Sequence, residues 1–538
     1  MIQLKINEVY IVNSEEMSVP LIISHIDLNF VNLRLDYLRS RLEKIACMGY
    51  NAVLWELEDK IEWESCPECV HPEAMSKMQF RELLNYARSL GLEPIPLLQT
   101  IGHAEYVLSQ PRYHAWREVP NRHDCYCTSA AEVRHFLAGW VQEYRDLFGE
   151  LRFFHLGGDE AFVFGSCPEC RAKIAATSAS ALYAEHLTAI AAPLISDGIR
   201  PGFWSDMLLH YPTERVTLPS AFVVWDWNYW DGCGPPERTM VWQHKRFVEK
   251  DTITCDPQQA MLPNLCDATG ALRPFHTVDT LQQYGFDIIL CSASRAYGDS
   301  FFTPFVSQRI DNIAGAASKA KSADLMGICV TSWALRLNRY ETQDLFSALA
   351  PAIMKSEQPV AEITSRIVPE SLISCLAQIG TLILDYNLFS AVHWNGLKDS
   401  TPAPAGHVAS TLADFVARQP ESWSNRFDLL DATLAAITAG LEALGRQETT
   451  ETSIAWREAG LLQLRFYQAL KMMIGATPDF AASYAAMSAL RKDYGWYLAQ
   501  VQTPINANYC AGLVFDPLLE YLDRARRIHR ISAEIAGV

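Results

Sequence analysis

Short apolar runs alternate with segments of helical periodicity from the start of the chain to about residue 350. This alternation predicts an α/β fold of repeated strand–helix–strand units, in which parallel strands pair and helices cover them. We expect eight strands, at Pro20–Asp27, Asn51–Glu56, Glu93–Leu98, Leu151–His155, Arg200–Trp204, Ala221–Trp225, Asp287–Cys291 and Met326–Ser332. Eight strands in this span predict a closed (β/α)₈ TIM barrel. A doubly wound open sheet is the alternative, but its GxGxxG loop is absent from the first strand–helix turn.

Beyond about residue 350 the strand-like runs give way to long segments rich in Ala, Leu, Glu and Arg, such as Arg426–Leu444, Ile454–Met473 and Leu518–Ile528. These segments predict an all-α C-terminal domain. We therefore divide the chain into a short N-terminal segment at 1–18, a catalytic barrel at 19–353 and an α-helical domain at 354–538. The helical domain could cover the barrel, form a homodimer interface, or do both.

The charge balance bears on the partners of the chain. Lys and Arg total 45 against 62 Asp and Glu, a formal net charge of −17, which argues against nucleic acid or an anionic membrane as the main partner. The N-terminus lacks the pattern of a secretory signal, and no apolar run is long enough to cross a membrane. We expect a cytoplasmic protein whose 14 cysteines are mostly reduced.

The predicted fourth strand leads into two glycines and two adjacent acids, in the order His155-Leu156-Gly157-Gly158-Asp159-Glu160. In a TIM barrel the carboxyl ends of the strands carry the active site. Adjacent acids on extended backbone point in different directions, so they cannot flank one bond symmetrically as the two acids of ordinary glycosidases do. The pair instead favours substrate-assisted hydrolysis, in which one acid protonates the leaving oxygen and the other holds the substrate's own nucleophile.

This segment resembles the His-x-Gly-Gly-Asp-Glu motif of glycoside hydrolase family 20, the β-N-acetylhexosaminidases. The segments Trp55–Lys60, Leu92–Glu105 and Trp204–Met207 are similar to the hexosaminidase D branch of that family. The resemblance implies an exo-acting, retaining glycoside hydrolase. It would remove terminal, non-reducing β-linked GlcNAc or GalNAc through an oxazolinium intermediate and need no cofactor for catalysis. A noncatalytic amino-sugar-binding barrel is the alternative function. A metal-dependent hydrolase would need a His-x-His strand end, which the sequence lacks.

The resemblance also implies roles for the two acids. Glu160 would act as general acid and then as general base, and Asp159 would orient the acetamido group. We expect the charge of Asp159 to raise the pKa of Glu160. His103 would lie near the general acid.

An acid from the second strand would complete a relay with that histidine. We favour Glu58 for this position, and Glu56 and Asp59 are the other acids of that segment.

Aromatic residues at the predicted strand ends offer walls for a sugar ring, whose C–H face is apolar: Trp204, Trp225, Trp227 and Trp333. Tyr229 could donate a hydrogen bond to the acetamido oxygen. The family's strand-one arginine is absent, and we expect His25 and Asp27, which share one strand face, to replace it. His155 is also assigned to the site.

The motif Cys66-Pro67-Glu68-Cys69 recurs as Cys167-Pro168-Glu169-Cys170. Both copies fall in loops at the carboxyl ends of predicted strands, and Cys125 and Cys127 lie between them in the sequence. We hypothesise a structural zinc held by Cys66, Cys69, Cys167 and Cys170. Free thiols or a redox-dependent disulfide are the alternatives.

Overall fold

The computed structural model describes residues 20–29, 31–211, 218–242, 245–250, 264–296, 298–333, 338–368, 379, 420–447, 450–475 and 477–536. The predicted segment 1–18 lies outside the described residues.

Eight parallel strands close into a barrel in the order β1-β10-β9-β6-β5-β4-β3-β2. They are β1 (Leu21–Asp27), β2 (Ala52–Glu56), β3 (Glu93–Leu97), β4 (Phe153–His155), β5 (Arg200–Trp204), β6 (Val223–Trp227), β9 (Asp287–Arg295) and β10 (Gly327–Ser332). The first and last strands pair directly, with Leu21 opposite Gly327. The predicted TIM barrel is confirmed, and each predicted strand overlaps an observed one.

Successive side chains along each strand point to opposite faces of the sheet, so they are divided between two hydrophobic cores. One set fills the barrel interior and includes Ile23, Leu54, Leu97, Trp204 and Trp225. The alternate set belongs to the core that the surrounding helices complete. Because interior positions continue to the carboxyl end of each strand, the same alternation decides which residues reach the mouth of the barrel at that end.

Helices cover the outside of the barrel: α1 (Leu35–Met48), α2 (Lys77–Ser89), α4 (Ala131–Phe148), α6 (Ala179–Ser196), α8 (His276–Gln283), α9 (Val306–Ser322) and α11 (Leu349–Lys355). These helices begin at capping residues or turns and bury one apolar face, as α2 illustrates. The α2 helix begins at Ser76, which forms a capping box with Gln79, and it buries Phe80, Leu83, Leu84 and Ala87 on one face.

Shorter elements lie in the loops: α3 (Glu105–Leu108), α5 (Pro168–Ala176), α7 (Asp206–His210), α10 (Asp344–Ser347) and α12 (Val360–Ile367). A hairpin of β7 (Arg238–Val241) and β8 (Arg246–Glu249) follows β6 and was not predicted.

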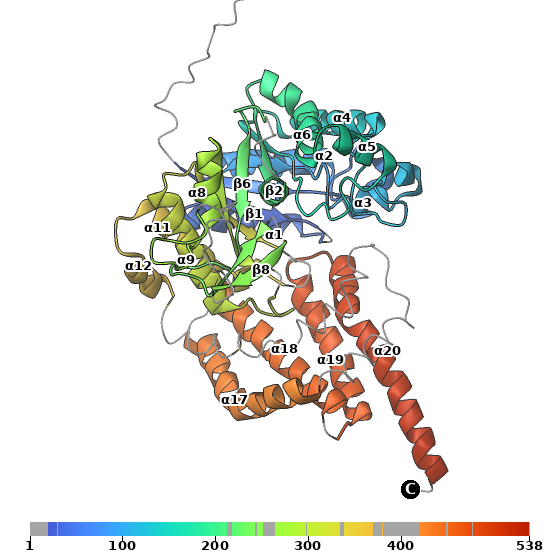
Figure 1. The fold of residues 1–538 in the computed structure, drawn as a ribbon. Coiled ribbons are helices and arrows are strands. Elements are labelled where there is room, and N and C mark those ends of the chain that lie inside the picture. Colours follow the sequence, from blue (N-terminus) through green and yellow to red (C-terminus); the bar gives the residue numbers. More distant parts are fainter. Residues whose placement is uncertain are drawn as a thin grey trace, which may run out of the picture.

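Four long helices make up the described C-terminal part of the chain: α17 (Pro420–Gln447), α18 (Glu451–Ile474), α19 (Phe480–Ala499) and α20 (Pro504–Ala536). They lie beside the barrel, in orange and red in Figure 1. The predicted helical segments fall within α17, α18 and α20. The predicted boundary at residue 353 lies inside α11, and the domain division stays a prediction.

The helical bundle packs against loops at the carboxyl ends of the strands. Leu33, after β1, forms an antiparallel bridge with Gln502 between α19 and α20. Phe302, after β9, packs on Phe466 of α18 with ring centroids 5.4 Å apart. The bundle therefore covers part of the barrel at the carboxyl ends of the strands, as one predicted arrangement requires, and the homodimer stays a prediction.

Among the described helices, none combines the length and the apolar character needed to cross a membrane.

Candidate active site

The turn after β4 places the adjacent acids. Gly157 and Gly158 take φ values of 64° and 88°, a left-handed conformation that glycine adopts without steric cost. Glu160 follows with φ 43°, an uncommon conformation for a residue with a side chain. The hydroxyl of Tyr183 donates a hydrogen bond of 3.0 Å to the Gly158 carbonyl. The sequence thus supplies a tight turn and a fixed platform for the two carboxylates.

His103, in the loop after β3, lies between these acids. Its Nε2 is 3.3 Å from Asp159 Oδ2 and 3.5 Å from Glu160 Oε2. The φ of His103 is 52°, so His103 and Glu160, which face each other, both have a left-handed backbone conformation. The prediction that His103 lies near Glu160 is confirmed.

The acids control the protonation of His103. Burial by itself lowers the pKa of a histidine, but the charge and hydrogen bond of Asp159 outweigh burial, and Glu105 and Glu160 add to the effect. The pKa of His103 is therefore raised well above its usual 6.5, and the ring is an imidazolium at neutral pH.

Asp206, directly after β5, is a third carboxyl group in the site. Its Oδ2 accepts a 2.9 Å hydrogen bond from the backbone N–H of Glu160, and its Oδ1 lies 3.4 Å from the Nε1–H of Trp227. Burial, and then the charge of Asp159, raise its pKa to about 8. Asp206 belongs to the segment Trp204–Met207, which is similar to hexosaminidase D, but the sequence alone indicated no role for it. Its position after an interior tryptophan at a strand end is the signal that could have found it.

Aromatic side chains surround the interior end of the barrel near these acids. The His155 ring lies 4.3 Å from Trp204 and 4.8 Å from Trp225 between centroids. Trp204 in turn lies 6.0 Å from Trp333. The predicted tryptophans of β5, β6 and the β10 end are therefore brought together.

Tyr229 joins this wall. It stacks on Trp227 with centroids 5.2 Å apart, and its hydroxyl oxygen accepts a 3.0 Å hydrogen bond from Trp333 Nε1.

His155 lies inside the barrel. Its Nδ1 accepts a 2.9 Å hydrogen bond from the backbone N–H of Gly157. Burial lowers its pKa well below 6.5, so the ring is neutral and can accept this bond. His155 therefore shapes the turn that carries Asp159 and Glu160.

The first two strands contribute a buried polar group. His25 Nε2 lies 3.2 Å from Glu56 Oε2, and Gln99 Nε2 donates a 3.0 Å hydrogen bond to Glu56 Oε1. The His25 ring packs 4.7 Å from Trp333. Asp27 is buried at the end of β1 and accepts a hydrogen bond from Asn29 N–H.

Glu58 lies two residues beyond the end of β2, with φ 43°, and is buried. Burial, and then the charge of Glu56, raise the pKa of Glu58 well above its usual range. The carboxylates that act on His103 are Asp159, Glu105 and Glu160. The relay through Glu58 or Asp59 stays a prediction.

Comparison with known proteins agrees with this arrangement. The sequence model described as "Glycosyl hydrolase family 20, catalytic domain" matches residues 36–259. Over these residues the chain is similar to the catalytic domain of glycosyl hydrolase family 20. This stretch contains His103, Asp159, Glu160 and Asp206, whereas β1, β9, β10 and the helical bundle lie outside it.

Among curated relatives of this chain, Hexosaminidase D of Bos taurus is 27% identical over 214 residues, which cover 38% of this chain and 62% of the relative. Hexosaminidase D of Homo sapiens is 26% identical over 214 residues, covering 38% of this chain and 44% of the relative. The alignments thus span less than two thirds of either relative. A solved β-N-acetylhexosaminidase from Bacteroides fragilis is 16% identical, covers 63% of this chain and 67% of its own, and has a TM-score of 0.46.

The cysteines in the barrel loops correct the predicted zinc ligands. Cys66 and Cys69 form a disulfide with each other, so neither thiolate is available to a metal. The remaining pair, Cys167 and Cys170, lies instead with Cys127 and Glu118, and the four ligand atoms are within 4.8 Å of one another. The position of both Cys-x-x-Cys motifs in loops at the carboxyl ends of predicted strands indicated a shared site. The loop conformation closes one motif on itself and brings a third loop cysteine to the other.

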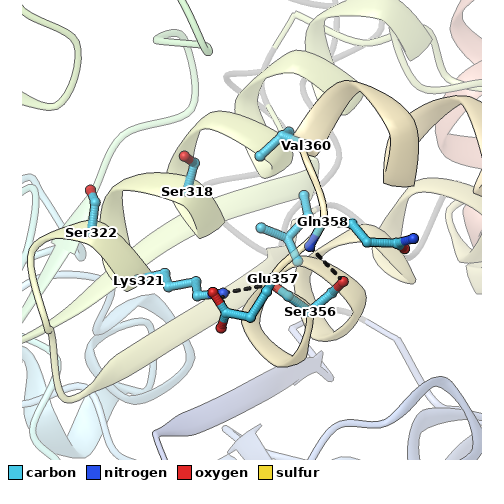
Figure 2. A pocket seen from close by; sticks show the side chains of 8 residues that line it. Ser318, Lys321, Ser322, Ser356, Glu357, Gln358 and Val360 are labelled. Atoms are coloured by element: carbon cyan, nitrogen blue, oxygen red, sulfur yellow. Dashed lines mark hydrogen bonds and ion pairs between the residues drawn. The ribbon is translucent and has the colours of Figure 1, made fainter.

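A pocket of about 300 Å³ lies elsewhere, where the C-terminal end of α9 meets the chain between α11 and α12 (Figure 2). It is lined by Ser318, Lys321, Ser322, Ile353, Ser356, Glu357, Gln358 and Val360. Lys321 and Glu357 form an ion pair of 2.8 Å across it. Because barrel helices run back from the carboxyl ends of the strands, the end of α9 is on the opposite side from Asp159 and Glu160.

Proposed function

We propose that this chain is an exo-acting, retaining β-N-acetylhexosaminidase that removes terminal, non-reducing β-linked GlcNAc or GalNAc by substrate-assisted catalysis. One observation carries the proposal: Asp159 and Glu160 follow β4 side by side, with His103 within 3.5 Å of both carboxylates. Two adjacent acids with different surroundings suit one protonating group and one orienting group. The family 20 match over this stretch supports the same chemistry.

Glu160 is the more exposed acid, with 38% of its side chain accessible, as a group that meets both substrate and water must be. In the first step it gives its proton to the glycosidic oxygen while the acetamido oxygen attacks C1 and the C1–O bond breaks. In the second step the Glu160 carboxylate takes a proton from water, and that water oxygen attacks C1 and opens the oxazolinium ring.

Asp159 is suited to hold the acetamido group. Its Oδ2 faces His103, while its Oδ1 is buried without a hydrogen-bond partner among the described residues. A buried acceptor of this kind is costly unless a ligand donor reaches it. The N–H of a 2-acetamido group would supply that donor, and the charge of Asp159 would stabilise the positive charge of the oxazolinium ring.

The aromatic wall is suited to the rest of the sugar. Trp204, Trp225 and Trp333 offer flat apolar surfaces to its C–H face, and Tyr229 OH, which accepts from Trp333, keeps its own proton to donate to the acetamido oxygen. His25, which contacts Glu56, and Asp27 are proposed to bind the sugar hydroxyls that the family's strand-one arginine would otherwise bind. The choice between GlcNAc and GalNAc depends on these two residues.

The proposed reaction uses protein side chains, the substrate and water, and it requires no cofactor. A cytoplasmic location, and the absence of nucleic acid and membrane partners, stay predictions from the sequence.

The test compares hydrolysis of nitrophenyl β-GlcNAc and β-GalNAc by the wild type, Glu160→Gln and Asp159→Asn. We expect the wild type to release nitrophenol and each variant to lose about 10²- to 10⁴-fold in kcat. A matching nitrophenyl β-glucoside, which lacks the acetamido nucleophile, should be inert.

A thiazoline analogue of the oxazolinium ring should inhibit the wild type competitively. Tight binding of that analogue without turnover of either substrate would instead identify a noncatalytic amino-sugar-binding barrel. Equal hydrolysis of the glucoside would contradict substrate assistance.

A further inference from the structure

Glu118, Cys127 and the Cys167–Cys170 pair meet in one cluster that the proposed reaction does not use. We propose that these four side chains bind a structural Zn²⁺ with a Cys₃Glu ligand set. The site would join the loop that carries His103 to the loop that carries Asp159 and Glu160.

The distances between the ligand atoms fit a tetrahedral zinc. With Zn–S near 2.3 Å and Zn–O near 2.0 Å, a regular tetrahedron has S···S edges of roughly 3.8 Å and S···O edges of roughly 3.5 Å. Cys127 Sγ lies 3.6 Å from Cys167 Sγ and 3.8 Å from Cys170 Sγ. Cys170 Sγ lies 3.4 Å from Glu118 Oε2. These three edges match those of a tetrahedral zinc site, and the other edges are no longer than 4.8 Å.

The surroundings of the cluster also resemble those of a metal site. Glu118, Cys127 and Cys170 are buried, and Cys167 is half-buried. The other carboxylate oxygen of Glu118 is fixed by a 2.9 Å hydrogen bond from Cys167 N–H, which leaves Oε2 facing the sulfurs. Such outer hydrogen bonds orient metal ligands.

Polar hydrogens surround the sulfurs as well. The backbone N–H of Cys170 donates to Cys167 Sγ over 3.2 Å, and the Ser129 hydroxyl lies 3.1 Å from Cys170 Sγ. Three thiolates and one carboxylate carry a charge that Zn²⁺ only partly cancels, and donors of this kind stabilise the remainder.

Backbone pairing brings the ligands together from two loops. Arg117 and Tyr126 form an antiparallel bridge that places their neighbours Glu118 and Cys127 close together. Cys167 is the N-cap of α5, and Cys170 lies in the first turn of that helix, which is the compact geometry of a Cys-x-x-Cys ligand pair.

The same segments reach the catalytic groups. Tyr126 N–H donates a 3.0 Å hydrogen bond to the carbonyl of Ile101, two residues before His103. Cys167 follows Glu160 by seven positions in the other loop. A metal that joins the two loops would fix the distance between His103 and the carboxylates of Asp159 and Glu160.

The experiment measures the zinc content of the intact purified protein and the absorption spectrum after replacement of zinc by Co²⁺. We expect about one zinc per chain and the intense visible bands of tetrahedral cobalt with thiolate ligands. Cys127→Ser and Cys170→Ser should reduce bound zinc at least about tenfold. Glu118→Gln, which keeps the shape of the side chain, should weaken zinc binding about 10- to 100-fold and shift the cobalt bands.

The paired change Cys66→Ser with Cys69→Ser, and separately Cys125→Ser, are the controls and should keep full zinc and an unchanged cobalt spectrum. Wild-type protein with reactive free thiols and no zinc would overturn the proposal, as would a disulfide between Cys127 and Cys167. Loss of zinc from the Cys66/Cys69 variant would show that the ligand set is wrong. All these readouts are independent of hydrolase activity, so they do not depend on the proposed function.

Discussion

His103 is the residue whose charge state most directly affects the acid pair. Its pKa is raised in the folded protein, chiefly by Asp159 against the opposing effect of burial, so its ion pairs stabilise the fold fully below about pH 6.5. That stabilisation is lost as the pH rises through the raised value.

We therefore predict that His103→Asn, which tolerates the left-handed backbone, lowers kcat/KM about 10²-fold and destabilises the protein most below pH 6.5. Steady-state kinetics would measure the change in kcat/KM. Urea unfolding at several pH values would measure the change in stability, which should shrink at alkaline pH. A difference that does not vary with pH would show that the imidazolium is not paired with the acids.

Asp206 gives a second pH-dependent prediction. Its folded pKa of about 8 lies above the unfolded value of about 3.9, so the neutral carboxyl stabilises the fold at low pH and this stabilisation is lost as the pH rises to 8. Asp206→Asn stays neutral, so its Tm relative to the wild type should increase between pH 4 and pH 9. The exposed Asp146→Asn is the control for removal of a surface carboxylate, and the pH trend of Asp206→Asn should exceed the trend of this variant. A flat difference for Asp206→Asn would contradict the buried neutral carboxyl.

At this scale, sequence reasoning succeeded where a residue belongs to a compact motif. Asp159, Glu160 and His103 each follow a predicted strand end, and the structure brings them together. Glu118 could not have been found, because a single acid in a long loop carries no pattern until backbone pairing places it beside Cys127. Asp206 was missed because its importance depends on a hydrogen bond to the backbone of Glu160.

Among the loop elements, close approach of the β3 and β4 loops sets the site geometry. A Cβ on Gly102 would lie 2.1 Å from the Asp159 carbonyl oxygen, so a side chain there must push the two loops apart. We predict that Gly102→Ala destabilises the protein by about 1–3 kcal/mol and lowers kcat/KM by displacing Asp159.

Gly139→Ala is the matched control for this change. Nothing lies within 4 Å of a Cβ at Gly139 in α4, so alanine there should leave activity unchanged and add about 0.5–1 kcal/mol of stability. Thermal unfolding and steady-state kinetics of both variants measure the contrast. Normal activity in Gly102→Ala would mean that the loops can separate without moving the acids.

The barrel elements were predictable because each strand is a short apolar run with a helix of period 3.6 after it. The β7–β8 hairpin was not predictable, because each of its strands has only four residues and β8 is largely exposed, so neither strand forms a clear apolar run. A disulfide was one alternative to zinc, but the sequence did not assign it to Cys66 and Cys69, because spacing cannot decide whether a Cys-x-x-Cys pair binds metal or closes on itself.

On the scale of the whole molecule, the bundle and the barrel share a buried interface. Phe466 of α18 is fully buried against Phe301 and Phe302 of the β9 loop. We predict that Phe466→Ala destabilises the protein by about 3–5 kcal/mol and lowers activity with it, because the loop it supports belongs to the active-site face.

Trp496→Ala serves as the comparison, since the Trp496 side chain in α19 is 62% exposed and its removal should change stability by less than about 0.5 kcal/mol. Calorimetry should record one unfolding transition for the wild type, which moves to lower temperature in Phe466→Ala. Two separate transitions, with activity unaffected, would show that the bundle unfolds independently of the barrel.

The bridge between the β1 loop and the α19–α20 turn has a consequence for how the protein is made. Asn32 N–H donates a hydrogen bond to Asn506, a residue that the ribosome adds 474 positions later. At roughly 5–20 residues per second, the β1 loop waits tens of seconds for this partner. Until α18 is made, the nascent barrel also exposes apolar loop residues such as Phe302, and transiently exposed apolar surface of this kind makes a chain prone to aggregation.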